Sequence, residues 1–229
     1  MAEADAVMHF WIGGFVLAGI VVGAVTAWAL RRDRARESAA LPVAGGSPED
    51  GTAEDAPFAD VSQESAAARV ERREHYYVAL RHQALHRSRA ELGLPKPSEA
   101  TKPWGVLMES THEDAFVTVL ALSDGSASIY LSTGGGFIGG IGQESIRHAA
   151  TRMVRVATGF VAGMTPTADY PLPDRGRTRF YVRTDAGVLT ADAPDAELAQ
   201  RRHALAPLFF AGQDVITAYR VLSEKNEKK

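Results

Sequence analysis

The chain has 229 residues, of which 45% are apolar and 23% are charged, the balance of an ordinary globular protein with one or two domains. Lysine and arginine total 25 against 28 aspartate and glutamate, and the net charge of −3 argues against a nucleic-acid-binding protein that depends on a broad basic surface. Cysteine is absent, which excludes disulfides, thiolate metal sites and cysteine nucleophiles.

The first predicted element is a transmembrane helix at residues 10–30, a stretch without any charged side chain. A helix of this length rises roughly 30 Å, which is the thickness of the hydrocarbon core of a bilayer. Trp11 and Trp28 lie near its two ends, where indole rings favour the headgroup boundary. The sequence therefore predicts a single-pass membrane protein with a short tail at residues 1–9.

The charges on either side of this helix predict its orientation. Residues 1–9 contain no lysine or arginine, whereas a basic cluster follows the helix directly and consists of Arg31, Arg32, Arg34 and Arg36. The positive-inside rule then places the N-terminus outside and the C-terminal part in the cytoplasm, at a bacterial inner membrane. A cleaved signal peptide is the alternative, but it would begin with basic residues and end at a small-residue cleavage site.

Small residues recur at every fourth position of the predicted span, at Gly19, Gly23 and Ala27. They share one helix face, on which a second helix could approach closely, and this suggests a homodimer formed through the membrane. The alternative is that glycine and alanine are simply common in membrane helices.

The basic cluster and the linker behind it occupy residues 31–61. Residues 37–60 are rich in proline, glycine and acidic residues and have no lysine or arginine, a composition typical of an unfolded linker. Such a linker has a typical reach of about 25–30 Å. An amphipathic helix is predicted over residues 62–93, and a proline-containing connector over residues 94–103.

Residues 104–222 predict an α+β domain with a mainly antiparallel sheet of about five strands, packed with two or three helices. Strands are expected at 104–108, 115–122, 128–131, 177–184 and 187–191, and helices at about 146–164, from Asp195, and from about Pro207. The order strand, strand, strand, helix, strand, strand, helix resembles that of roadblock, longin and profilin domains. This resemblance implies a scaffold or binding role and assigns no residue. A charged tail, residues 223–229, ends the chain.

A glycine-rich segment is the main candidate site, and its residues are Gly134, Gly135, Gly136, Phe137, Ile138, Gly139, Gly140 and Ile141. It satisfies the dinucleotide pattern G-x-G-x-x-G, but a predicted hairpin precedes it and no phosphate-binding lysine accompanies it. Glu144 in the first helical turn would also repel a phosphate. Three interpretations remain, namely a structural segment, a partner-binding surface that includes the apolar side chains, or a small-ligand site.

Basic residues form the second candidate surface. Arg152 and Arg155 share a polar helix face with His148 and Thr151, and arginines alternate along the strand at residues 177–184. Either surface could receive an acidic partner or the anionic lipid headgroups of a nearby membrane. The alternative is an ordinary solvated face, because the domain is not basic overall.

No metal, cofactor or catalytic site is predicted. His75, His82 and His86 share one side of a helix, but they lack the carboxylate of an H-E-x-x-H motif, and we expect them to be solvated. The chain also lacks a G-x-S-x-G nucleophile motif. These observations favour a membrane-tethered, non-catalytic binding or scaffold module that holds a protein partner or a membrane-proximal ligand. The alternative is a small-molecule sensor or an enzyme that uses the glycine-rich segment as a lid.

The orientation can be tested with a reporter fused after Lys229. We expect a reporter that is active only in the cytoplasm to be active there, because the basic cluster keeps the C-terminal part inside. Activity of a reporter that functions only outside the cytoplasm would reverse the predicted topology.

Overall fold

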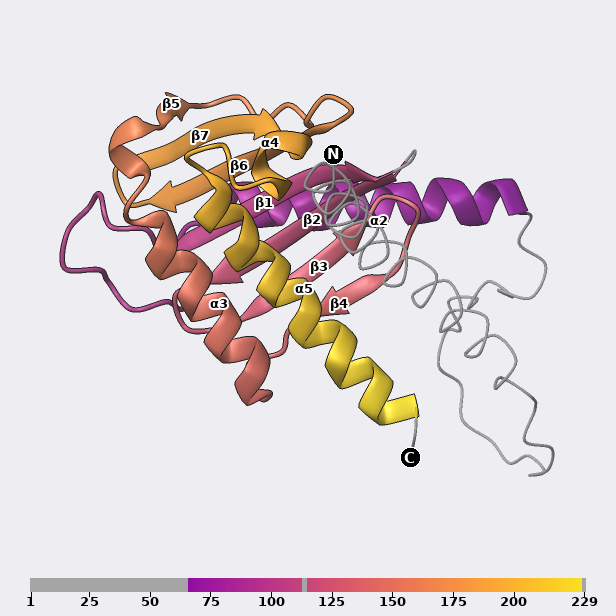
Figure 1. Cartoon of the computed structure of the whole chain (residues 1–229). Coiled ribbons are helices and arrows are strands. Elements are labelled where there is room, and N and C mark those ends of the chain that lie inside the picture. Colours follow the sequence, from indigo (N-terminus) through magenta and orange to yellow (C-terminus); the bar gives the residue numbers. More distant parts are fainter. Residues whose placement is uncertain (1–65, 113–114, 228–229) are drawn as a thin grey trace, which may run out of the picture.

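The computed structural model describes residues 66–112 and 115–227 (Figure 1). The predicted membrane helix with Gly19, Gly23 and Ala27, and the linker after it, lie outside the described residues. Within the described ranges, no helix is both long and apolar enough to cross a membrane. The described chain is an α+β domain with an antiparallel seven-stranded sheet, which confirms the predicted fold class of the domain.

The elements follow one another as α2 (Ala66–His86), β1 (Gly105–His112), β2 (Ala115–Leu122), β3 (Ala127–Leu131), β4 (Gly136–Ile138), α3 (Glu144–Ala157), η2 (Val161–Gly163), β5 (Thr165–Thr167), β6 (Arg177–Thr184), β7 (Gly187–Pro194), α4 (Asp195–Ala199) and α5 (Ala206–Glu227). The order of strands in the sheet is β4-β3-β2-β1-β6-β7-β5, so β1 is the middle strand. The sequence predicts about five strands, and β4 and β5 are the additional ones.

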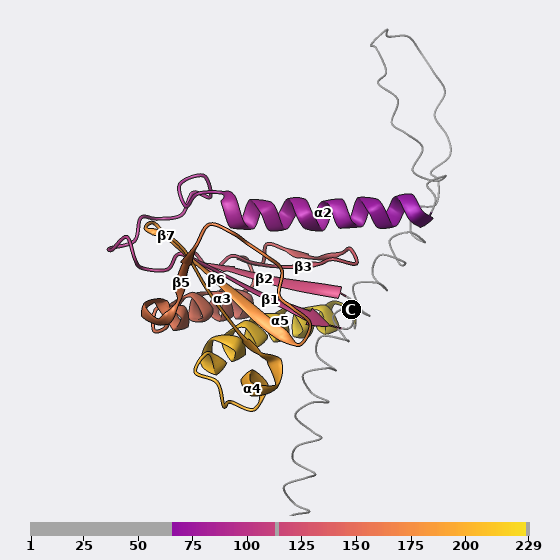
Figure 2. The same cartoon turned by 90° about the horizontal axis from the view of Figure 1, so that it is seen from above.

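Helices cover both faces of the sheet, so the domain has three layers. Figure 2 shows α2 on one side of the sheet and α3 and α5 on the other. Successive side chains of β1 point to opposite faces of the sheet, and both faces are apolar. Met108 packs with α3 and α5, whereas Leu107 packs on the α2 side. At Gly212 of α5, an added Cβ would lie 2.5 Å from the sulfur of Met108, so glycine allows the helix to lie close to the sheet.

Helix α3 has the strongest sequence pattern in the domain, and the structure confirms it. The buried residues recur at helical spacing and are Ile146, Ala150, Met153, Val154 and Ala157. By contrast, α2 ends at His86, earlier than predicted. The turn that follows is stabilised by Glu91, whose carboxylate accepts hydrogen bonds from the backbone N–H and the hydroxyl of Ser88 at 2.7 and 2.6 Å.

A buried ion pair connects α2 to the middle strand. The guanidinium of Arg81 donates to both carboxylate oxygens of Glu109 at 2.7 Å, and Glu109 is 0% exposed. The hydroxyl of Thr118 donates to the same carboxylate at 3.0 Å, and the hydroxyl of Tyr77 lies 3.1 Å from that of Thr118. Since a buried charge is tolerated only with such partners, these contacts fix the position of α2 along the sheet.

A second cation holds the C-terminal end of α2. Arg183 of β6 is 5% exposed and donates to the carbonyls of Ala84 and Arg87, both at 2.6 Å. Its guanidinium carbon lies 4.2 Å from the ring centroid of Trp104. A cation at this position compensates the carbonyl groups left free at a helix C-terminus. Burial lowers the pKa of Arg183 to about 10, which leaves the side chain charged at neutral pH.

We predict that Arg81→Ala lowers the free energy of unfolding by about 3–5 kcal/mol, because it leaves the Glu109 carboxylate buried without a counter-charge. The matched control is Arg152→Ala, which removes the same side chain from an exposed ion pair with Asp214 and should cost less than about 1 kcal/mol. Chemical unfolding of the full-length chain, followed by the near-ultraviolet signal of its aromatic residues, measures both. Equal losses in the two variants would contradict a special role for the buried pair.

Candidate functional site

The glycine-rich segment begins with the turn from β3 into β4. Gly136 has φ +136° and an added Cβ would lie 2.1 Å from the carbonyl oxygen of Ile129, so no other residue fits this close approach of the two strands. The segment therefore contains an edge strand of the sheet, which is more order than the sequence predicts. A strand of three residues is too short to show a period-2 pattern.

The two apolar side chains of β4 have different environments. Phe137 packs against the core on the α3 and α5 face, with its ring centroid 4.8 Å from that of Tyr219 in α5. Ile138, next in the strand, points to the opposite face of the sheet and is 73% exposed. Ile141 in the following loop is 48% exposed. Phe137 thus fits the structural interpretation, and the two isoleucines remain accessible to a partner.

Tyr219 attaches the segment to α5. Its hydroxyl lies 2.6 Å from the carbonyl oxygens of Ala127 and Gly139, and its single proton can be donated to one of them at a time. Burial raises the pKa of Tyr219 above its ordinary value, so the hydroxyl remains a donor at any physiological pH. An added Cβ on Gly140 would lie 2.7 Å from this hydroxyl, which shows how closely the loop packs there. The contact spans 80 positions, and no local sequence pattern could have indicated it.

Arg152 and Arg155 lie away from the segment. Arg152 forms an ion pair with Asp214 of α5, and Arg155 is exposed in the last turn of α3. Both are two to three helical turns beyond Glu144, a separation of roughly 12–17 Å along the helix axis. Two other arginines reach the segment: Nη1 of Arg147 lies 3.4 Å from the carbonyl oxygen of Ile141, and the side chain of Arg73 in α2 packs against Gly134. The position of Arg147 in the first turn of the predicted helix is the sequence feature that indicates its closeness to the segment.

The arginines of β6 do not form a free basic surface. Arg177 donates to Asp192 at 2.5 Å, and Nη1 of Arg179 lies 3.3 Å from the carbonyl oxygen of Pro171. Arg183 is buried beneath the end of α2. Most of the positive charge on this strand is therefore engaged in contacts within the domain.

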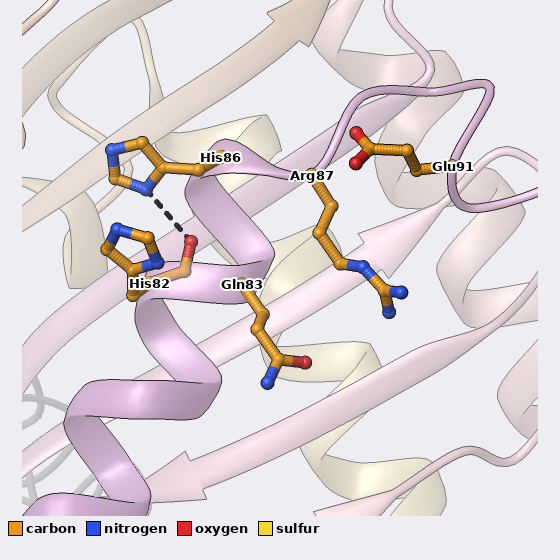
Figure 3. Close-up of a pocket in the computed structure, with 5 residues that line it drawn as sticks. All are labelled: His82, Gln83, His86, Arg87 and Glu91. Carbon is orange, nitrogen blue, oxygen red and sulfur yellow. Dashed lines mark hydrogen bonds between the residues drawn. The ribbon is translucent and has the colours of Figure 1, made fainter.

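Two of the three histidines on α2, His82 and His86, line a shallow hollow of about 380 Å³ together with Gln83, Arg87 and Glu91, whereas His75 does not. In Figure 3 the rings of His82 and His86 lie together on one side, whereas Gln83 and Arg87 point away from them. The two rings are stacked with centroids 4.0 Å apart, and Nδ1 of His86 lies 2.9 Å from the carbonyl oxygen of His82. No group of three potential metal ligands occurs among the described side chains. The residues do not converge on a common ligand position.

The buried network around Glu109 is the other cluster of ionisable groups. Burial, together with the nearby carboxylate, raises the pKa of Tyr77 to about 12. Nη2 of Arg81 also donates to the carbonyl of Tyr170 at 2.8 Å, so the loop before β6 is part of the same network. These groups are occupied with one another, and such a saturated network is typical of a structural role.

Comparison with known proteins gives no assignment, since no protein-family model, curated protein or solved structure matches this chain.

We predict that Tyr219→Phe lowers the free energy of unfolding by about 1–2 kcal/mol, because it leaves a buried carbonyl without its donor. Hydrogen exchange of the backbone amides at residues 139–143 should also become faster. Tyr76→Phe is the matched control, since it removes the same hydroxyl from a side chain that is 65% exposed. Unchanged exchange at residues 139–143 in the Tyr219 variant would show that this hydroxyl does not hold the segment.

Proposed function

We propose that this protein is a membrane-tethered, non-catalytic binding or scaffold module that holds a protein partner at the cytoplasmic face of the inner membrane. The proposal depends on one observation above all. Two isoleucines, Ile138 and Ile141, are 73% and 48% exposed on a segment that is itself attached to the core. Exposed apolar side chains mark an interaction surface when they lie close together, and these two are three positions apart in the chain.

The composition around these isoleucines supports the same function. No charged residue occurs in the sequence from Ala127 to Gln143, although the side chains of Arg73 and Arg147 reach this segment from α2 and α3. Charged residues are depleted in the centres of protein interfaces, where water is excluded. Because Tyr219 and Phe137 already hold the backbone, a partner would pay little conformational entropy to bind here.

The alternative of a sensor or enzyme with a mobile lid has less support. The segment packs on α5 through Phe137 and Gly140, whereas the hollow on α2 is lined by different residues on the other side of the sheet. The buried side chain of Glu109 contacts Arg81 and Thr118, and that of Arg183 contacts backbone carbonyls at the end of α2, so these charged groups have partners inside the domain. Binding through a preformed surface therefore explains more of the observed contacts than catalysis does.

The predicted membrane anchor would keep this surface close to other membrane-associated proteins. A linker with a reach of about 25–30 Å would confine the domain to a thin layer beside the bilayer. Tethering converts a weak encounter with another membrane-associated protein into a local one, so the small surface of two isoleucines can be sufficient.

We predict that photochemical or chemical crosslinking of the full-length protein in native membranes gives a discrete product. The double substitution Ile138→Ser and Ile141→Ser should reduce that product by roughly tenfold or more, because the apolar contacts are lost. Phe137 is left unchanged, since its ring packs on the core. Val78→Ser is the control, an equivalent change at a side chain that is 60% exposed on α2. A product of equal yield in all three proteins, or no product, would overturn the proposed function.

A further inference from the structure

The two edges of the sheet differ in how they are protected. The outer strand β5 has Pro166 at its centre, and proline lacks the N–H that an added strand would need. The other outer strand, β4, contains glycine, phenylalanine and isoleucine, with neither proline nor charge. In Figure 1, β4 is the outermost strand on its side of the sheet. Among the described residues, proline therefore blocks strand addition at the β5 edge, whereas β4 pairs with no strand other than β3.

The pairing of β4 with β3 determines which backbone groups face outward. The N–H of Leu131 donates to the carbonyl of Gly135 at 3.3 Å, and Ile129 lies opposite Phe137. In an antiparallel ladder, hydrogen-bonded residue pairs alternate with pairs that are not hydrogen-bonded. Phe137 and Ile129 are therefore the next hydrogen-bonded pair between β4 and β3. The N–H and C=O groups of Gly136 and Ile138 consequently point away from β3, toward the open edge.

We propose that the partner held at this edge is a second copy of the same chain, and that the two β4 strands pair antiparallel about a twofold axis at Phe137. This inference rests on the proposed function, and it names the partner for the same surface. In this register Gly136 of each copy lies opposite Ile138 of the other, so all the outward backbone groups of both strands are satisfied. The contact is self-complementary, as a twofold interface requires.

Side-chain shape supports this register over others. Gly136 has no side chain and lies beside Tyr130 of β3. An isoleucine placed opposite Gly136 would therefore cover the edge of that tyrosine without a clash. The two copies of Ile138 would be diagonal neighbours on one face, about 7 Å apart, which is close enough for their side chains to touch. The most exposed large apolar side chain of the described domain would be buried in this way.

The predicted membrane anchor would raise the local concentration of a second copy. A contact of three residues per strand buries far less surface than the roughly 1,200 Å² that stable complexes bury. Such a contact requires a high local concentration of the two chains. Sixty-five residues precede α2, and they include the uncharged run at residues 10–30 that is predicted to cross the membrane. Anchors in one bilayer, or paired through Gly19, Gly23 and Ala27, would keep two domains within linker reach of each other.

The test uses the full-length chain reconstituted in lipid vesicles, with a spin label attached to a single introduced cysteine. The protein has no cysteine of its own, so Thr133→Cys provides one label at the exposed turn between β3 and β4. Pulsed dipolar spectroscopy should give a defined distance of about 20–30 Å between the labels of two copies, as the geometry of paired strands requires. Thr165→Cys, the same change on the edge that contains Pro166, should give no defined distance in this range.

The second step introduces a charged side chain, at Ile138 or at Val78, into the chain that carries the label at Thr133→Cys. Ile138→Asp should abolish the defined distance, whereas Val78→Asp, at an apolar side chain that is 60% exposed on α2, should leave it unchanged. Absence of a defined distance from Thr133→Cys, or its persistence in the Ile138→Asp background, would overturn the pairing. If the crosslinked product described above requires Ile138 but contains a different protein, the proposed function stands and self-pairing fails.

Discussion

The structure depends on the way in which a carboxylate at the centre of the sheet is neutralised. Glu109 lies in β1, the middle strand, and its charge would be prohibitively costly there without the guanidinium of Arg81. That requirement brings α2 over this face of the sheet, where it covers Leu107 and Tyr181. The opposite face is covered in the ordinary apolar way by α3 and α5. The domain thus combines one layer attached by charge and hydrogen bonds with another attached by hydrophobic packing.

Both faces of the sheet are covered by helices, so the edges are the remaining places where backbone groups can meet a partner. Pro166 blocks one edge, and Tyr219 holds the loop beside the other in a fixed conformation. The glycine-rich segment contributes β4, the short strand at the second of these edges. Its glycines permit close approach to Ile129 and to Tyr219, which are structural tasks, and its two isoleucines, Ile138 and Ile141, are exposed.

Local patterns were sufficient to predict much of this fold from the sequence. The spacing of Ile146, Ala150 and Met153 indicates α3, and the Asp-Gly turn after β2 indicates the hairpin with β3. Contacts between distant residues could not be predicted, because nothing near Arg81 in the chain indicates Glu109, and nothing near Gly139 indicates Tyr219. For the candidate residues, the sequence shows that Ile138 and Ile141 are apolar but not that both are exposed, and it does not indicate the ion pair of Arg152 with Asp214, which depends on the packing of α3 against α5.

Helix α2 is also the element through which the N-terminal part of the chain joins the domain. It lies flat against the sheet, and its attachments are Arg81 to the middle strand and Arg183 at its far end. A pull on the N-terminal side of the chain would act along the helix and load these contacts together, in shear, rather than opening them one after another. The side chain of Arg73, near the start of α2, packs against Gly134 in the turn between β3 and β4, so part of that load would also reach the edge of the sheet that contains β4.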